Sequence, residues 1–350
     1  MNRLKSIVLT MLAVATVVGF TVAPAMPVEA QGSAALSITP RKNYTIEPGK
    51  GVKDTLAIRN LDNERDLQLS LRVVDFTYTD DGGTPKLMLA EDAPQTTWSL
   101  KPFVDLAEEF VEIEAGGSKS VEVDVNVPSN QGAGSFYSAI VYSSGASEGG
   151  NVGLSASGVS LMFVTVPGEV DEKLTLEKLG AYDDTTRQYK RVIAKMPTRM
   201  AYTLNNEGNV VESPVGSITL RDLFGRETVI NDINPNGSLA LIGQTRTFES
   251  CIVQRSQEVD FNGSRQEATT CAESGLWPGF YRVKLDAYYG QNGSATHELN
   301  GSSWFFYLPW WFVIVSLIVL AFLAYHIWRF VRFVRNKRSA PKLKNRSSNK

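Results

Sequence analysis

The pattern Gly-x-Ser-x-Gly is the first group of residues whose types and spacing could do chemistry. It occupies residues 145–149. In serine hydrolases this pattern places the nucleophile on a strained turn between a strand and a helix, within reach of a histidine base. Here it lies in a loop of Gly and Ser, no helical pattern follows it, and the nearest histidine along the chain is His297. The sequence therefore argues against a serine hydrolase.

Two pairs of adjacent carboxylates are the next candidates for chemistry. Glu108-Glu109 and Asp183-Asp184 could serve as glycosidase acids, but those enzymes need two carboxyl groups placed across a sugar. Adjacent residues of a strand point to opposite faces, and those of a turn point to solvent. The sequence also has no glycine-rich loop that opens a helix and would hold a phosphate. We therefore expect no enzymatic activity, no cofactor and no small-molecule substrate.

The only two cysteines of the chain are Cys251 and Cys271. Two cysteines and a distant His297 are too few ligands for a zinc site, so no metal is expected. Disulfides persist in exported proteins, and the N-terminal sequence predicts export. We therefore predict a disulfide between the two residues. It would restrain a polar insertion and, by the chain-entropy model, contribute about 3 kcal/mol of stability.

Residues 1–30 have the features of a secretory signal peptide. Arg3 and Lys5 carry positive charge, residues 7–22 are apolar, and Val28-Glu29-Ala30 offers small side chains for cleavage after Ala30. Cleavage after Ala25 is an alternative. Another alternative is an uncleaved anchor, although the apolar stretch is short for a bilayer span. The residues that follow are predicted to be exported.

A transmembrane helix is predicted near the C-terminus, within residues 304–328. Residues 310–328 form an apolar run of 19 residues, close to the roughly 20 that cross the hydrocarbon core. Trp310 and Trp311 at one edge and Trp328 at the other fit the headgroup level, where amphipathic rings are enriched. His326 inside the run is interpreted as a residue tolerated near the interface, with a proton relay as the alternative.

Positive charge follows this helix at once. Arg329 and Arg332 open a basic tail, residues 329–350, that has no Asp or Glu. Such an excess of basic residues marks the cytoplasmic side of a membrane. The chain is therefore predicted to be a single-pass protein of the cell membrane, with its N-terminal domains extracellular and its tail cytoplasmic.

The net charge of the 350-residue chain is −2, but the charge is unevenly distributed. Residues 304–350 contain nine Lys and Arg, which leaves residues 31–303 at about −12. An acidic surface repels phosphates, so no nucleic-acid partner is expected.

Alternation of apolar and polar residues predicts β-strands in the exported part. Residues 67–73 and 121–127 alternate with period two, whereas residues 159–166 are continuously apolar, as in a strand buried on both faces. Turn formers lie at residues 60–63 and 80–83. Further strands are predicted over residues 174–176, 189–196, 202–204, 218–220, 228–230 and 281–287.

The spacing of these strands indicates an all-β fold. Pro167-Gly168 marks a break after which the pattern restarts. We therefore predict two tandem immunoglobulin-like β-sandwiches, residues 34–168 and residues 169–300, the second with the insertion bounded by the cysteines.

The first of these domains resembles a known family. The stretch SITPRKNYTIEPGKGVKDTLAIRNLDNERDLQLSLRVVDFTYTDDGG, followed by WSLKPFVDLAEEFVEIEAGGSKSVEVDVNVPSN and GSFYSAIVYSS, is similar to the N-terminal domain of WxL-interacting proteins. Those are surface proteins of Gram-positive bacteria. The resemblance covers residues 34–166 and implies an immunoglobulin-like, peptidoglycan-binding domain. The same stretch also resembles the wider group of bacterial sandwiches that includes the periplasmic pilus chaperones.

These features together predict a non-catalytic, membrane-anchored binding or scaffold protein of the bacterial cell envelope. Its expected partners are peptidoglycan or other surface proteins, and the membrane through one helix. The alternative is a chaperone-like assembly factor that binds secreted subunits through an exposed sheet edge. A sensor that signals inward is disfavoured because the tail is short.

Aromatic residues are the candidates for ligand contact. Trp98 and Phe103 flank a loop that contains Lys101 and Pro102, and we predict that they are exposed contacts. The rings of Phe136, Tyr137 and Tyr142 could stack on sugars, but their positions along one strand favour the core instead.

Overall fold

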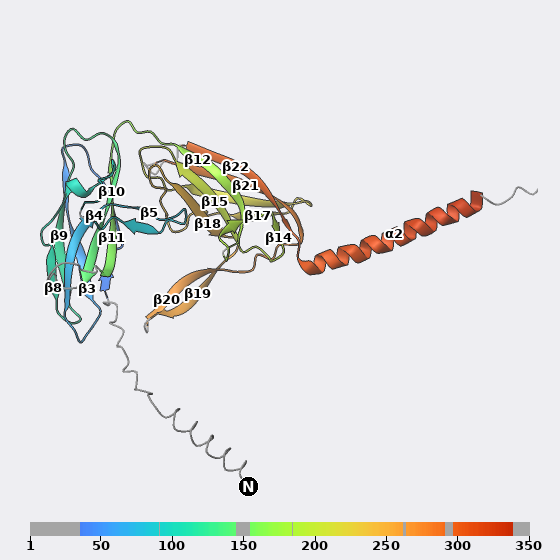
Figure 1. Cartoon of the computed structure of the whole chain (residues 1–350), viewed down its shortest axis with the longest axis horizontal. Helices are drawn as coiled ribbons and strands as arrows, with labels where there is room; N and C mark the ends of the chain where they lie inside the picture. The colour runs from blue at the N-terminus through green and yellow to red at the C-terminus, as the bar shows by residue number, and fades with distance from the viewer. Residues whose placement is uncertain are drawn as a thin grey trace, which may run out of the picture.

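The computed structural model describes residues 36–90, 92–144, 155–183, 185–261, 264–290 and 297–338. The predicted signal peptide (residues 1–30), the Gly-x-Ser-x-Gly pattern, Asp184 and residues 339–350 of the basic tail lie outside the described residues. The described residues form two β-sandwiches in a row, followed by one long helix (Figure 1). The chain is therefore mostly β, with two immunoglobulin-like sandwiches in tandem, as the sequence predicted.

Two sheets make the first sandwich. Their strand orders are β1-β3-β9-β7 and β2-β11-β10-β4-β8, and β5 and β6 form a separate hairpin. A 3-10 helix, η1 (Lys101–Phe103), leads into β7. The strands are β1 (Leu36–Ile38), β2 (Arg41–Thr45), β3 (Gly51–Asn60), β4 (Leu67–Val74), β5 (Phe76–Tyr78), β6 (Pro85–Leu87), β7 (Val104–Leu106), β8 (Phe110–Ile113), β9 (Ser118–Asn126), β10 (Gly134–Ser144) and β11 (Ser155–Val166).

The core of the first sandwich comes from the predicted alternation. In β3, β4 and β9 the buried residues include Leu56, Leu71 and Val123, and the residues between them point outward. β10 differs because nearly all of its residues are buried. Its Ile140 faces this core, whereas its Tyr137 faces the other side of the sheet, where it joins the core shared with the second sandwich.

The second sandwich has the same plan. Its sheets have the orders β13-β12-β15-β18 and β14-β22-β21-β16-β17. The strands are β12 (Leu174–Asp183), β13 (Gln188–Tyr189), β14 (Val192–Ile193), β15 (Arg199–Asn206), β16 (Val215–Asp222), β17 (Glu227–Ile230), β18 (Thr245–Cys251), β21 (Gly279–Tyr289) and β22 (His297–Tyr307).

Residues 189–196 do not form the single strand that the sequence predicted. They contribute to β13, which pairs with β12, and then to β14, which pairs with β22 in the other sheet. A segment that crosses from one sheet to the other cannot keep one ladder of hydrogen bonds. Two short strands replace the predicted one.

The polar insertion is a β-hairpin closed at its base by the predicted disulfide. β19 (Gln254–Phe261) pairs with β20 (Ser264–Cys271). Cys251 and Cys271 are bonded, with their Cα atoms 5.0 Å apart. The disulfide prediction is confirmed, and the expected loop has a regular backbone.

Strand β22 extends the second sandwich beyond the predicted boundary at residue 300. It pairs with β21 from His297 to Tyr307, so Trp304 belongs to a strand, opposite Arg282, and not to a membrane helix. The sequence misled at this point because aromatic residues 304–307 continue directly into the apolar run. In the structure Phe305 and Tyr307 are buried while Trp304 and Phe306 face outward, which is a strand periodicity.

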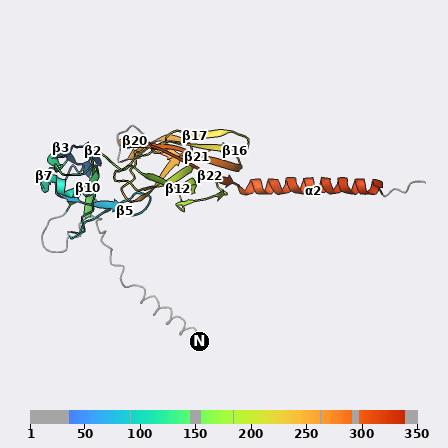
Figure 2. The ribbon, with the colours of Figure 1, turned by 90° about the horizontal axis from the view of Figure 1, so that it is seen from above.

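One described helix is long and apolar enough to cross a membrane. It is α2 (Trp310–Arg338), whose candidate span Trp310–Arg335 has no buried residue. This helix fits a single membrane span. It leaves the second sandwich at the end opposite to the first sandwich (Figures 1 and 2). The first sandwich is therefore the distal one with respect to α2.

A third core joins the two sandwiches. It contains Phe76, Tyr137 and Phe163 of the first sandwich and Leu241 of the second, all buried. The β5–β6 hairpin extends from the first sandwich toward the second (Figure 1). Its tip residue Asp81 accepts a hydrogen bond of 2.6 Å from the Thr247 N–H. The sandwiches are thus held together by a shared core and by hydrogen bonds across it.

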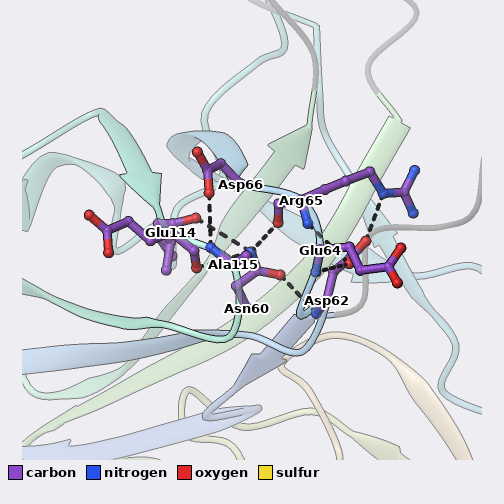
Figure 3. A network of polar contacts seen from close by, with 8 residues as sticks. Asn60, Asp62, Glu64, Arg65, Asp66, Glu114 and Ala115 are labelled. Carbon is purple, nitrogen blue, oxygen red and sulfur yellow. Dashed lines mark hydrogen bonds and ion pairs between the residues drawn. The ribbon is translucent and has the colours of Figure 1, made fainter.

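The predicted turn at residues 60–63 is built around a buried asparagine (Figure 3). The Asn60 Nδ2 donates to the carbonyl oxygens of Arg65 (2.8 Å) and Glu114 (3.2 Å), and its Oδ1 accepts from the Asp62 N–H (3.0 Å). One side chain thereby joins the β3–β4 turn to the β8–β9 turn. The polar residues of the resemblance motif have a structural role here.

The second sandwich uses the same device at the end of β15. The Asn206 Nδ2 donates to the carbonyl oxygens of Val210 (2.7 Å) and Ala240 (2.9 Å), and its Oδ1 accepts from the Gly208 N–H (3.0 Å). Both asparagines are buried. Each asparagine side chain forms hydrogen bonds with backbone groups that have no strand partner because the chain turns there.

Candidate binding grooves

A groove of about 450 Å³ lies along one side of the first sandwich, where the edges of its two sheets approach each other. Residues 71–74 of β4 form one wall and residues 104–106, which make up β7, form the other. Residues 88–90 run along the groove, and Lys101 and Glu109 complete it. We call this site the first groove.

Part of the β4 edge and the outer edge of β7 face the first groove without a neighbouring strand among the described residues. β8 pairs with β4 only as far as Ser70, after which the Leu71 N–H donates to the Glu109 carbonyl. Alternate residues of a strand direct their backbone groups to the same side, so the N–H and C=O of Val73 point into the groove. β7 is the outer strand of its sheet. An extended polypeptide could pair with either edge.

The side chains of the first groove are aliphatic or charged, and none is aromatic. Arg72 and Lys101 supply positive charge, and Asp105 and Glu109 supply negative charge. The Arg72 guanidinium donates to the Leu89 carbonyl at 2.8 Å and so fixes the segment along the groove. This lining suits a peptide with mixed side chains, and it lacks the aromatic ring on which sugars often stack.

A buried carboxylate positions the loop that supplies Lys101. The Asp75 Oδ1 accepts hydrogen bonds from the hydroxyls of Ser99 (2.6 Å) and Ser138 (3.0 Å). The Ser138 hydroxyl oxygen also accepts from the Leu100 N–H at 3.1 Å. Asp75 therefore ties the start of η1 to β10, and this holds one end of the first groove in place.

A second groove, of about 350 Å³, lies along a seam of the second sandwich, next to the parallel pair β14–β22 and so at the opposite end of the shared strand order from the first groove. Residues 176–180 of β12 and residues 302–304 of β22 form its walls, with residues 189–191 at one end. The Phe306 N–H donates to the Arg191 carbonyl, so by alternation the backbone groups of Trp304 and Ser302 point to this same, unpaired side. The second groove thus also exposes a strand edge.

Aromatic rings distinguish the second groove from the first. The Trp304 ring stacks on Phe280 with centroids 6.0 Å apart and meets the edge of Phe306 at 6.1 Å. The Arg191 guanidinium lies 4.7 Å from the centre of the Trp304 ring. The second groove therefore borders a flat, partly exposed aromatic surface of the kind on which a sugar ring can stack.

The structure places the two predicted ligand contacts differently from the prediction. Trp98 is half-buried and stacks on Tyr137, with ring centroids 6.2 Å apart. Phe103 is half-buried as well, and its ring packs against Phe136 at 5.7 Å. They face different cores, because η1 turns the chain between them, and do not form an exposed pair. Phe136, Tyr137 and Tyr142 are core residues, as predicted.

The residues that could have done chemistry are not brought together. Glu108 is paired with Lys119 at 2.6 Å, and Asp183 is paired with Lys190 at 2.5 Å. His297 contacts Glu172 at 2.7 Å. Within the part of the chain that the structure describes, no cluster of three or more His, Cys, Asp or Glu side chains could hold a metal ion.

One carboxyl group has a strongly perturbed acidity. Glu212, which is 1% exposed, lies in the second sandwich, and its Oε1 has no hydrogen-bond partner among the described residues. Burial, together with the nearby Glu172 carboxylate, raises the pKa of the Glu212 carboxyl from 4.5 to about 8. Glu212 lies in neither groove, so we assign it to the stability of the second sandwich.

The predicted membrane-interface residues lie near the two ends of the apolar run of α2, and their depth in a membrane stays a prediction. Trp310 and Trp311 occupy its first turn, and both are exposed. Trp328 and Arg329 lie 18 and 19 residues after Trp310, about 27 Å along the helix. The Arg332 guanidinium lies 5.4 Å from the Trp328 ring. The orientation of the helix in a membrane stays a prediction.

The grooves were missed by sequence reasoning. The sequence predicted the strand that contains Leu71 and Val73, but not the short strand that contains Val104. It also does not say which strand edges stay unpaired. The one available signal was the short spacing between β7 and β8, which limits how far either strand can pair. For the second groove, the assignment of Trp304 to the membrane helix concealed its role.

No protein-family model matches the chain, and no curated protein sequence is similar to it. Among solved structures, the chain is similar to one described as "Chaperone-tip adhesin complex is vital for synergistic activation of CFA/I fimbriae biogenesis", with 10% identity and a TM-score of 0.35 over 79% of this chain and 100% of that one. It is also similar to the class 5 fimbriae chaperone CfaA (10%, 0.34, 78% and 99%) and to the E. coli chaperone DraB (12%, 0.31, 79% and 98%). At these identities the likeness concerns the fold alone.

Proposed function

We propose that this chain is a non-catalytic, membrane-anchored binding protein of the bacterial cell envelope. α2 anchors it, the two sandwiches are extracellular and the basic tail is cytoplasmic. The basic residues after Trp328 support this orientation. The distal sandwich then holds a partner near the membrane.

The observation that carries this proposal is the first groove. It lies on the sandwich farther from α2, and unpaired edges of two strands face it. The shared core around Phe76 and Leu241 connects this sandwich to the anchored one, so a partner in the groove is held by the anchor. Because the groove offers backbone edges and mixed charge without an aromatic ring, we favour an extended segment of another surface protein as the partner.

Peptidoglycan is the partner that the family resemblance implies. In this structure the surface that suits a sugar is the aromatic one around Trp304, beside the second groove. Wall attachment through this surface is compatible with protein binding at the first groove. The two partners can be distinguished because the protein would need the first groove, whereas peptidoglycan would need the second.

A chaperone-like assembly factor is the second candidate function. The same unpaired edge of β4 favours it, since strand addition is how such a protein would hold a subunit. A scaffold keeps its partner, whereas an assembly factor releases it when the subunit is incorporated. A pulse-chase of any complex would therefore separate these functions.

Photo-crosslinking of the full chain in its native membrane tests the proposal. A photoreactive residue replaces Asp105, which is exposed in the first groove, and the matched control carries it at Lys178, which is exposed in the second. We expect a polypeptide adduct from position 105 and none from position 178. Adducts from neither position, or equal adducts from both, would contradict the proposal.

A further inference from the structure

Three large apolar side chains are exposed at one end of the second sandwich. Leu223 and Phe224 form the tip of the β16–β17 hairpin and are 71% and 89% exposed, and Trp277, just before β21, is 66% exposed. Most of the other strongly exposed apolar residues lie on α2. Such side chains are costly to leave in water.

The strand register places these residues at the end from which α2 departs. Gly279 of β21 pairs with Tyr307 of β22, and Asp222 of β16 pairs with Tyr281 of β21. The hairpin tip that follows Asp222 is therefore level with the end of β22. It lies two strands to the side, at about 10 Å, because neighbouring strands are 4.7–4.9 Å apart.

The connection between β22 and α2 is too short to separate this end from the membrane. Only Leu308 and Pro309 lie between Tyr307 and Trp310. The Leu308 N–H donates to the Ile193 carbonyl at 2.8 Å, and Pro309 is buried. Since the segment that can span the membrane starts at Trp310, the end of the sandwich lies at the membrane surface.

The hairpin tip is held in a fixed shape. The Asp222 Oδ1 accepts hydrogen bonds from the N–H groups of Phe224 (2.8 Å) and Arg226 (2.9 Å), and its Oδ2 accepts from the Arg226 Nε (2.7 Å). Gly225 has a φ of 85°, which a side chain would disfavour. With the Asp222 carboxylate bonded within the turn, the tip presents Leu223 and Phe224 outward, beside the exposed Arg226.

Trp277 is joined to the same surface. The Arg226 guanidinium lies 5.8 Å from the centre of the Trp277 ring, so the loop before β21 and the hairpin tip are neighbours. The Trp277 carbonyl accepts a hydrogen bond of 2.8 Å from the Tyr281 hydroxyl, which fixes the loop on β21. Leu223, Phe224 and Trp277 thus form one apolar rim, which we call the membrane rim.

We propose that the membrane rim inserts into the headgroup region of the outer leaflet. There it adds a second contact with lipid beside the helix anchor and fixes the tilt of the sandwiches over the membrane. Trp is enriched at this depth, and apolar side chains on a rigid, polar-capped support bind lipid surfaces in this way. The proposal rests on the anchoring proposed above but not on the identity of any partner in the grooves.

Depth-dependent fluorescence quenching of the full chain in lipid vesicles tests this proposal. Both natural cysteines are in the disulfide, so a single added cysteine can be labelled with an environment-sensitive dye. Phe224→Cys tests the membrane rim. Phe110→Cys is the matched control, since Phe110 is 65% exposed on the distal sandwich. Leu320→Cys, in the middle of α2, reports whether the anchor itself is inserted.

The vesicles contain phosphatidylcholine and phosphatidylglycerol. In one preparation some lipids carry a spin label near the headgroup, to report on positions 224 and 110, and in a second preparation near the end of the acyl chain, to report on position 320. We expect the dye at position 224 to be quenched at least about twofold more than the dye at position 110. Trp277→Ser in the Phe224→Cys chain should weaken this quenching. If position 320 is quenched while position 224 behaves like position 110, the membrane rim proposal is overturned and the anchor stands. If position 320 is not quenched either, the anchor is overturned with it.

Discussion

Each sandwich has a groove where its two sheets meet, but the grooves lie at opposite ends of the shared strand order and offer different groups to a partner. In the first sandwich the unpaired edges of β4 and β7 face the groove, and the lining has no aromatic ring. In the second, the edges of β12 and β22 face the groove, and Trp304 lies beside Arg191. The comparison teaches that incomplete strand pairing sets where a groove forms, while the side chains on the flanking strands set what it can bind.

The shared features of the two sandwiches concern stability. A buried asparagine ends β3 in one and β15 in the other, with three hydrogen bonds of the same kind. The features that differ are the outer aromatic stack and the raised pKa of the buried Glu212 carboxyl, both in the second sandwich. Substitutions can therefore test either a feature that both sandwiches share or a feature that only the second sandwich has.

The largest expected effect comes from the core that the sandwiches share. Phe76 is fully buried and contacts the rings of Tyr137 at 5.3 Å and Phe163 at 6.0 Å. Phe76→Ala should lower the free energy of unfolding by about 3–5 kcal/mol. It should also split one thermal transition of the full chain in detergent into two. Phe110→Ala, at an exposed ring, is the control and should change little. A single unshifted transition for Phe76→Ala would show that the shared core does not couple the sandwiches.

Next in size are the two asparagines, which test whether the sandwiches use one device. Asn60→Ala and Asn206→Ala each leave buried backbone carbonyls without a donor, and we expect each to cost about 2–3 kcal/mol. Chemical denaturation followed by intrinsic fluorescence measures both. The account of a common device fails if one variant is as stable as the parent while the other is not.

Between pH 5 and 9, the second sandwich should show a pH dependence of stability that comes from Glu212. Because the pKa of Glu212 is about 8 in the folded chain and about 4.5 when unfolded, the folded state binds the extra proton between these values. Stability from this group is complete below pH 4.5 and decreases as the pH rises toward 8, by up to about 1.4 kcal/mol per unit. Glu212→Gln should remove that slope, measured by denaturation from pH 5 to 9. Glu177→Gln, at an exposed carboxylate of the same sandwich, should retain it, and an unchanged slope in Glu212→Gln would refute the assignment.

Trp304→Ala is expected to have the smallest effect on stability. It also distinguishes the two grooves most clearly, because only the second groove borders this ring. The ring is partly exposed on the outer face, so we expect a loss of about 1 kcal/mol or less. If peptidoglycan stacks on this ring, co-sedimentation of the full chain with insoluble peptidoglycan should fall, while crosslinking at Asp105 should not change. Sedimentation that is independent of Trp304 would remove the second groove as a sugar site.

Much of the fold follows from local sequence patterns. Alternation of apolar and polar residues predicted β4 and β9. A continuous apolar run predicted β11, and a cluster of Asp and Gly predicted the hairpin tip between β5 and β6. These features depend on neighbours along the chain, which one sequence shows directly. The disulfide was predictable because export and two cysteines leave few other choices.

The rest depends on contacts between distant segments. The split of residues 189–196 into β13 and β14 is decided by which sheet each part meets. Trp304 was misassigned because an aromatic strand end and a membrane span are both apolar, and only the pairing with β21 separates them. The first groove exists because β8 stops pairing at Ser70, which no local pattern specifies.

We propose above that the unpaired part of the β4 edge holds a polypeptide partner. Val73→Pro tests it most directly, because proline removes the N–H that points into the first groove without removing a bond between β4 and β10. Ser302→Pro makes the same change at the edge of β22 in the second groove. With the photoreactive residue at position 105, the account predicts that Val73→Pro abolishes the polypeptide adduct and that Ser302→Pro leaves it intact. An adduct that survives Val73→Pro in a folded chain would contradict the account.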